Sequence, residues 1–157
     1  VSELAASRSP RLLYQDIQTG PACCLDRSGE LVPDTTVWIL PSADPFLLAV
    51  LNSPLYGWYA RRRFPPALNG AVRPKHEYMR SLPIASPSPA ARAAIEQLVE
   101  QRLAVERELR MIKAEPRRRD APASRSASSL DAAIGTAVLD AYELSVAERA
   151  LVLADQA

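Results

Sequence analysis

Cysteine, histidine and glycine are scarce in this sequence, and their scarcity excludes several kinds of site. The two cysteines, Cys23 and Cys24, are adjacent, which is too close for a relaxed disulfide. We therefore expect reduced thiols and a cytoplasmic protein. A single histidine, His76, excludes a two-histidine metal site. The five glycines are isolated and form no phosphate-binding loop, so we expect no metal or cofactor in this chain.

Long apolar runs are also missing. No stretch approaches the roughly 20 apolar residues that a membrane span requires, and no secretory signal is present. We therefore expect no membrane partner. The sequence begins with Val1, and its only methionines are Met79 and Met111, which leads us to expect a piece of a larger protein.

The net charge of +1 at pH 7 argues against a general polyanion binder, but the positive charge is unevenly distributed. Residues 61–80 hold six basic residues and one acidic residue, whereas acids outnumber bases in residues 1–60. Arginines interleaved with aromatic residues suit nucleic acid, because guanidinium groups bind phosphates and guanine edges. The alternative is a solvated helix end, where cations are favoured by the helix dipole. The candidate DNA-binding residues are Arg61, Arg62, Arg63, Arg73, Lys75, His76, Tyr78 and Arg80.

No catalytic motif accompanies this cluster. Asp16, Asp26, Glu30 and Asp34 lie beside expected turns, and nothing near them supports a nuclease site. The segment 52–56, Asn-Ser-Pro-Leu-Tyr, begins and ends like an Asn-Pro-Pro-Tyr methyltransferase motif, but Ser53 and Leu55 replace the two prolines of that motif. We interpret it as the junction between two helices, and we assign no catalytic residue.

The N-terminal half predicts a small, mostly antiparallel sheet with packed helices. Residues 12–17 and 35–40 are typical of strands, and residues 23–25 and 31–32 predict a hairpin around the turn 26–30. A helix is expected from Asp44-Pro45.

Proline then sets the next boundaries. Pro54 ends the first helix, a second continues into Arg63, residues 64–74 form a loop, and residues 78–84 are expected to be extended.

The C-terminal half predicts a helical extension. A long helix over 89–115 carries an apolar seam, a flexible linker covers 116–128, and helices over 129–154 are expected to pair as a hairpin. The seam consists of Ile95, Leu98, Val105, Leu109 and Ile112, with Arg102 at its one charged position. We expect this seam to pack within the chain against Leu130, Ile134 and Val138, leaving a monomer. The fold class is thus α+β, with a module at 1–86 and an extension at 87–157.

The order of these segments resembles a known family. Tyr14 to Ile17, Asp34 to Ile39, Leu47 to Ser53, Arg73-Pro74 and Tyr78 to Ile84 follow one another as in the TaqI-like C-terminal specificity domain. That family occurs in bacterial adenine-N6 DNA methyltransferases, type IIG restriction–modification enzymes and phage-defence methylases. The end of the chain, from Leu139 to Arg149, is similar to the closing helix and turn of these enzymes. Leu144-Ser145 replaces their usual Tyr-Gly.

The resemblance implies a division of labour. A separate catalytic domain would hold S-adenosylmethionine, and this chain would bind double-stranded DNA and select the site to be methylated. Only Arg73, Pro74 and Tyr78 lie on a recurring pattern of the family. The alternative function is a protein-interaction module, in which the helix over 89–115 forms a dimerising or scaffolding coiled coil.

Overall fold

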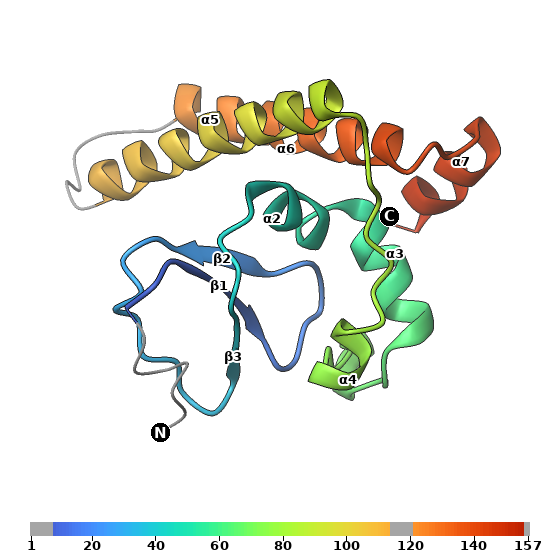
Figure 1. Ribbon diagram of the computed structural model, residues 1–157, viewed down its shortest axis with the longest axis horizontal. Helices are drawn as coiled ribbons and strands as arrows, with labels where there is room; N and C mark the ends of the chain where they lie inside the picture. The colour runs from blue at the N-terminus through green and yellow to red at the C-terminus, as the bar shows by residue number, and fades with distance from the viewer. Residues whose placement is uncertain (1–7, 114–120, 156–157) are drawn as a thin grey trace.

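A three-stranded antiparallel sheet forms one side of the molecule (Figure 1). The structure is a computed structural model and describes residues 8–113 and 121–155. Strand β1 (Arg11–Gln15) lies between β2 (Cys23–Asp26) and β3 (Val37–Leu40). Leu13 is paired with Cys24 on one side and with Ile39 on the other. The sheet and the helices that follow confirm the α+β class.

The turn after β2 differs from the expected hairpin. Asp26 accepts hydrogen bonds from the backbone N–H groups of Gly29 and Leu31 at 2.9 and 3.1 Å. The chain therefore turns away from β2, and Leu31 and Val32 are exposed outside any strand. The prediction of a strand at 31–32 is wrong because a buried carboxylate, and not a neighbouring strand, binds this backbone.

Two short helices confirm the expected capping signals. In α2 (Pro45–Leu51), the side chain of Asp44 accepts from the Phe46 N–H at 2.9 Å. In α3 (Pro54–Arg63), the hydroxyl of Ser53 accepts from the Tyr56 N–H at 3.2 Å. Residues 52–56 thus form the helix junction that the sequence predicts.

After α3 the chain forms a 3-10 turn, η1 (Leu68–Gly70), and a single helical turn, α4 (His76–Met79). The Lys75 carbonyl accepts from the N–H groups of Tyr78 and Met79 at 2.9 and 3.0 Å. The extended conformation expected over 78–84 is therefore wrong for Tyr78 and Met79. The segment 82–88 has no regular secondary structure and leads into the next helix.

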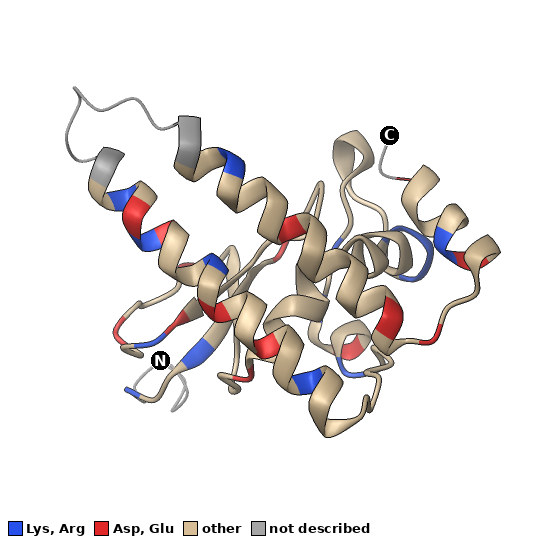
Figure 2. Cartoon of the chain, turned by 90° about the horizontal axis from the view of Figure 1, so that it is seen from above, with Lys and Arg blue, Asp and Glu red and all other residues tan. Residues whose placement is uncertain are grey.

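Two long helices lie side by side across α2 (Figures 1 and 2). They are α5 (Pro89–Lys113) and α6 (Ala121–Ala141). Residues 121–128 are therefore helical, and the prediction of a flexible linker is wrong there, while 114–120 lie outside the described residues. Alanine is the strongest helix former, and Ala127 is buried, so composition and packing both stabilise this first part of α6.

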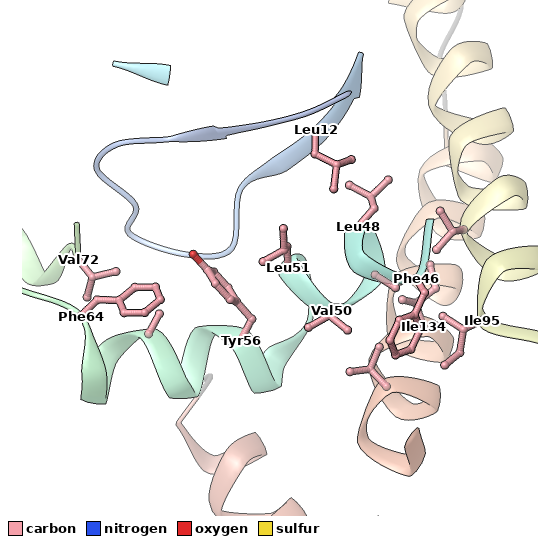
Figure 3. Packing of buried hydrophobic residues seen from close by; sticks show 14 residues of the cluster. Leu12, Phe46, Leu48, Val50, Leu51, Tyr56, Phe64, Val72, Ile95 and Ile134 are labelled. Carbon is pink, nitrogen blue, oxygen red and sulfur yellow. The ribbon is translucent and has the colours of Figure 1, made fainter. Parts of the chain in front are cut away.

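The core joins both halves of the chain. Phe46 lies between the sheet and the helix pair, and Ile95 of α5 and Ile134 of α6 pack in the same cluster (Figure 3). The buried side chains of this core include Leu12, Phe46, Val50, Leu51, Tyr56, Phe64, Ile95, Val99, Ile134 and Val138. The expected packing of the long helix against Ile134 and Val138 is thus present within one chain. The boundary at residue 86 stays a prediction.

The last helix, α7 (Val146–Ala154), begins with the expected capping box. Ser145 and Glu148 exchange hydrogen bonds, from the Glu148 N–H to the Ser145 hydroxyl and from the Ser145 N–H to the Glu148 carboxylate. The helix packs against α3. The expected hairpin within 129–154 is therefore wrong, because the partner of α6 is α5.

Candidate nucleic-acid interface

The eight candidate residues lie in two places. Arg61, Arg62 and Arg63 are the last turn of α3, close to the C-terminal end of α7. Arg73, Lys75, His76, Tyr78 and Arg80 surround the short helix α4. The two groups differ in how many of their charges are already engaged within the chain.

The first group is largely engaged in an ion-pair network. Arg61 donates through Nε and Nη2 to Oδ2 of Asp155 at 2.8 and 2.6 Å. Arg62 reaches the same carboxylate at 3.0 Å and stacks over the ring of Trp58, 4.4 Å from its centroid. These bonds hold the pKa of Asp155 below its ordinary value. Arg63 is exposed. The structure thus gives Arg61 and Arg62 a role in anchoring α7 to α3.

The second group borders a pocket of about 450 Å³ between β3 and α4. Its lining residues are Asp16, Thr35, Trp38, Arg73, Lys75, His76 and Glu77. Three of the expected residues therefore meet at one place, and four further residues join them. Lys75, His76 and Glu77 are exposed at its rim.

Asp16 bonds to two of the other residues that line this pocket. Its Oδ1 accepts a hydrogen bond from the indole Nε1 of Trp38 at 3.0 Å, and its Oδ2 accepts from Nη2 of Arg73. The bonds from Trp38 and Arg73 outweigh the effect of burial and lower the pKa of Asp16 below 3.8. Asp16 is therefore a carboxylate at neutral pH, with both oxygens engaged.

The backbone around Arg73 is fixed from several sides. Val72 and Gln18 exchange two backbone hydrogen bonds of 2.9 and 3.0 Å, and the Arg73 N–H donates to the Pro65 carbonyl at 2.9 Å. The buried Gln18 side chain also accepts from the hydroxyl of Tyr56 at 3.0 Å. Pro74 follows as a fully buried residue. The core thus sets the position of Arg73 relative to Asp16.

The remaining two candidate residues of this group, Tyr78 and Arg80, do not line the pocket. The ring of Tyr78 packs against Phe64 with a centroid distance of 5.9 Å, alongside the hydrophobic core. Arg80 is exposed at the C-terminal end of α4. The geometry gives Tyr78 a packing contact and leaves Arg80 on the surface.

Sequence reasoning missed Trp38 and Thr35, and it treated Asp16 as an ordinary residue beside a turn. The sequence correctly predicts Trp38 as a strand residue, but Trp38 lines the same pocket as Arg73, which is 35 positions later in the chain. A period-two pattern locates a strand and does not reveal which loop reaches its end. The Gln18–Val72 bridge holds the segment of Arg73 beside the end of β1, and Asp16 accepts hydrogen bonds from both Trp38 and Arg73.

The described residues offer neither a membrane span nor a metal site. None of the helices there is long and apolar enough to cross a membrane. No group of three or more His, Cys, Asp or Glu side chains in the same residues could hold a metal ion.

The comparisons with known proteins show a likeness in structure and none in sequence. No protein-family model matches the sequence, and no curated protein matches it. Among solved structures, the chain is similar to the Type IIL restriction–modification enzyme MmeI in complex with DNA, with a TM-score of 0.68 and 15% sequence identity. The match covers 88% of this chain but only 19% of the MmeI chain. The fold is therefore similar to that of one part of a restriction–modification enzyme.

Proposed function

We propose that this chain is the DNA-recognition module of a restriction–modification enzyme or DNA methyltransferase. The observation that carries the proposal is the fold, which is similar over 88% of its length to part of an enzyme solved with DNA. In the finer form of the proposal, the chain is a TaqI-like specificity domain of an adenine-N6 methyltransferase. It binds duplex DNA sequence-specifically and positions a separate catalytic domain on the site.

The surface around α4 supports this proposal. It combines basic side chains with hydrogen-bond acceptors and with Trp38, an aromatic residue that is 41% exposed. Phosphate contacts fix the position of a protein on DNA, whereas contacts to base edges select the sequence. Exposed cations such as Arg63 and Arg80 suit the first task, and the mixed pocket suits the second.

Catalysis and cofactor binding belong, in this proposal, to the parent enzyme's other domain. The chain alone then transfers no methyl group and does not bind S-adenosylmethionine. Calorimetric titration with S-adenosylmethionine tests this part, and we expect no saturable heat. Saturable binding at micromolar concentration would show that the cofactor site lies in this chain.

Selection from a random duplex library tests recognition itself. The purified chain is incubated with duplexes that contain a randomised centre, and bound DNA is recovered and sequenced over several rounds. We expect one short motif to be enriched. Recovery of duplexes without any enriched motif contradicts sequence-specific recognition, even if the chain binds DNA.

A further inference from the structure

The pocket around Asp16 has a charge balance that does not suit a phosphate. Its two carboxylates, Asp16 and Glu77, offset its two cations, Arg73 and Lys75. A phosphate-binding site gains its affinity from net positive charge and from the release of counterions. A pocket with balanced charges and many donors and acceptors is better suited to a neutral polar group, such as the edge of a nucleobase.

Arg73 has the features of a base-reading side chain. Nη2 of its guanidinium is bonded to Asp16, and no other side-chain partner of Arg73 is found in the described parts of the chain. Nε of Arg73 is buried without a hydrogen-bond partner, but the side chain as a whole is 43% exposed, so its terminal N–H groups remain available to a ligand in the pocket. The ion pair with Asp16 reduces the net attraction of Arg73 for phosphate but leaves these N–H groups in place.

Asp16 also limits how the guanidinium can turn. One carboxylate oxygen accepts from Trp38 at 3.0 Å and the other from Arg73. Because Val72 and Pro74 on either side of Arg73 are buried, the backbone cannot readily shift either. Recognition of a base edge requires such a prepositioned side chain, whereas a phosphate can be reached by a mobile one.

From these observations we propose that Arg73 reads the O6 and N7 atoms of a guanine in the major groove, with Asp16 as its positioning residue. The proposal rests on the proposed function, since it names the contact through which this chain selects DNA. Guanine presents two neighbouring acceptors that match two guanidinium donors, and this is the commonest specific contact of arginine with DNA.

The test repeats the duplex selection with Arg73→Ala, Arg73→Lys and Arg110→Ala. Arg110 is an exposed residue of α5 that pairs with Glu106 and does not line the pocket. Thermal unfolding checks that each variant is folded. Affinities are then measured for the selected duplex and for duplexes in which each G·C pair is replaced in turn.

We expect the wild-type motif to contain a G·C pair whose replacement weakens binding by roughly 5- to 150-fold. Arg73→Ala should accept any base pair at that position and keep its preference elsewhere. Arg73→Lys should weaken the same preference although it keeps the charge, because a flexible ammonium group lacks the planar fork that aligns two parallel bonds. Arg110→Ala should select the wild-type motif.

Two results would overturn the proposal. In the first, Arg73→Lys keeps the wild-type motif while Arg73→Ala weakens binding equally on all duplexes, which identifies a phosphate contact. In the second, the preference that is lost concerns a position other than G·C. A wild-type chain that enriches no motif contradicts the proposed function itself. This outcome can be told apart from the two results that overturn the role of Arg73.

The role of Asp16 has its own readout. Asp16→Asn removes the charge that offsets Arg73 while an amide can still accept a hydrogen bond. We expect weaker discrimination at the guanine position together with a steeper dependence of affinity on salt, because Arg73 is then free to attract phosphate. If Asp16→Asn weakens binding but leaves the discrimination at the guanine position and the salt dependence of affinity unchanged, Asp16 only stabilises the fold.

Discussion

Arg61 and Asp155 are 94 positions apart in the sequence, yet the guanidinium of one donates two hydrogen bonds to Oδ2 of the other, at 2.8 and 2.6 Å. A third bond, of 2.9 Å, joins Arg61 to the Asp155 carbonyl. The pair fastens the end of α7 to the last turn of α3. An arginine that the sequence offers as a DNA ligand therefore has a structural partner.

We predict that Arg61→Ala loosens α7. Without the pair, the contact between α7 and α3 loses its polar anchor, and the amide hydrogens of residues 146–155 should exchange faster than in the wild type. Hydrogen exchange followed by mass spectrometry measures this. Arg63→Ala, the exposed neighbour, is the matched control and should leave α7 unchanged. Equal exchange in all three proteins would show that the ion pair contributes nothing to docking.

A second pair, Arg11 and Asp26, holds the loop after β2. Both side chains are 2–3% exposed, and Nε of Arg11 lies 3.5 Å from Oδ2 of Asp26. Arg11 donates to the carbonyls of Gly29 and Leu31, while Asp26 accepts from the N–H groups of the same two residues. The two side chains thus bind both polar groups of Gly29 and of Leu31.

Removing one member of the Arg11–Asp26 pair should destabilise the fold. Asp26→Ala leaves a buried guanidinium without its counter-ion, and we expect the free energy of unfolding to fall by about 3–5 kcal/mol. Urea denaturation measures the change. Glu30→Ala, an exposed acid in the same loop, should change stability by less than about 0.5 kcal/mol. Similar values for the two variants would contradict the account of this loop.

The same carboxylate gives a pH dependence with a definite sign. Burial raises the pKa of Asp26, but hydrogen bonds from Ser28, Leu31 and Gly29 and the charge of Arg11 outweigh it, so that its pKa lies below 3.8. Because the folded pKa is the lower one, this stabilisation is complete above pH 3.8 and is lost as the pH falls below it. Unfolding measured from pH 5 to pH 2 should show a smaller pH dependence in Asp26→Asn than in the wild type. Parallel curves would assign the acid sensitivity to other groups.

The sequence allowed the regular elements to be located from local signals. Asp44-Pro45, Ser53-Pro54 and the Ser145–Glu148 box each place a helix start where the structure has one, because capping depends on residues three positions apart or fewer. The helical turn at Tyr78 and Met79 is a local feature that the sequence reading missed, and two further errors concern contacts between distant segments. The backbone at 31–32 is bound by Asp26, and residues 121–128 are helical on the surface of α5, although their composition is typical of a linker.

We predict that the apolar seam of α5 packs within the chain and does not bind a second copy. Ile95 is 2% exposed within the common core, and Arg102 of the seam pairs with Asp131 of α6 at 2.8 Å. Ile95→Ala should therefore lower the free energy of unfolding by about 2–5 kcal/mol. Sedimentation should find a monomer for the wild type and a destabilised monomer for Leu109→Asp. A wild-type dimer that Leu109→Asp converts into a folded monomer would favour the dimerising coiled coil.

Sequence-specific recognition of duplex DNA is the central claim, and the ratio of two affinities tests it most directly. The affinity of the chain for its selected duplex is compared with that for a scrambled duplex of equal length and composition, over a series of salt concentrations. Both affinities should fall as salt rises, because phosphate contacts contribute to each. We predict that the selected duplex binds about 1,000-fold more tightly or better at physiological salt. A ratio near one at every salt concentration would contradict the account.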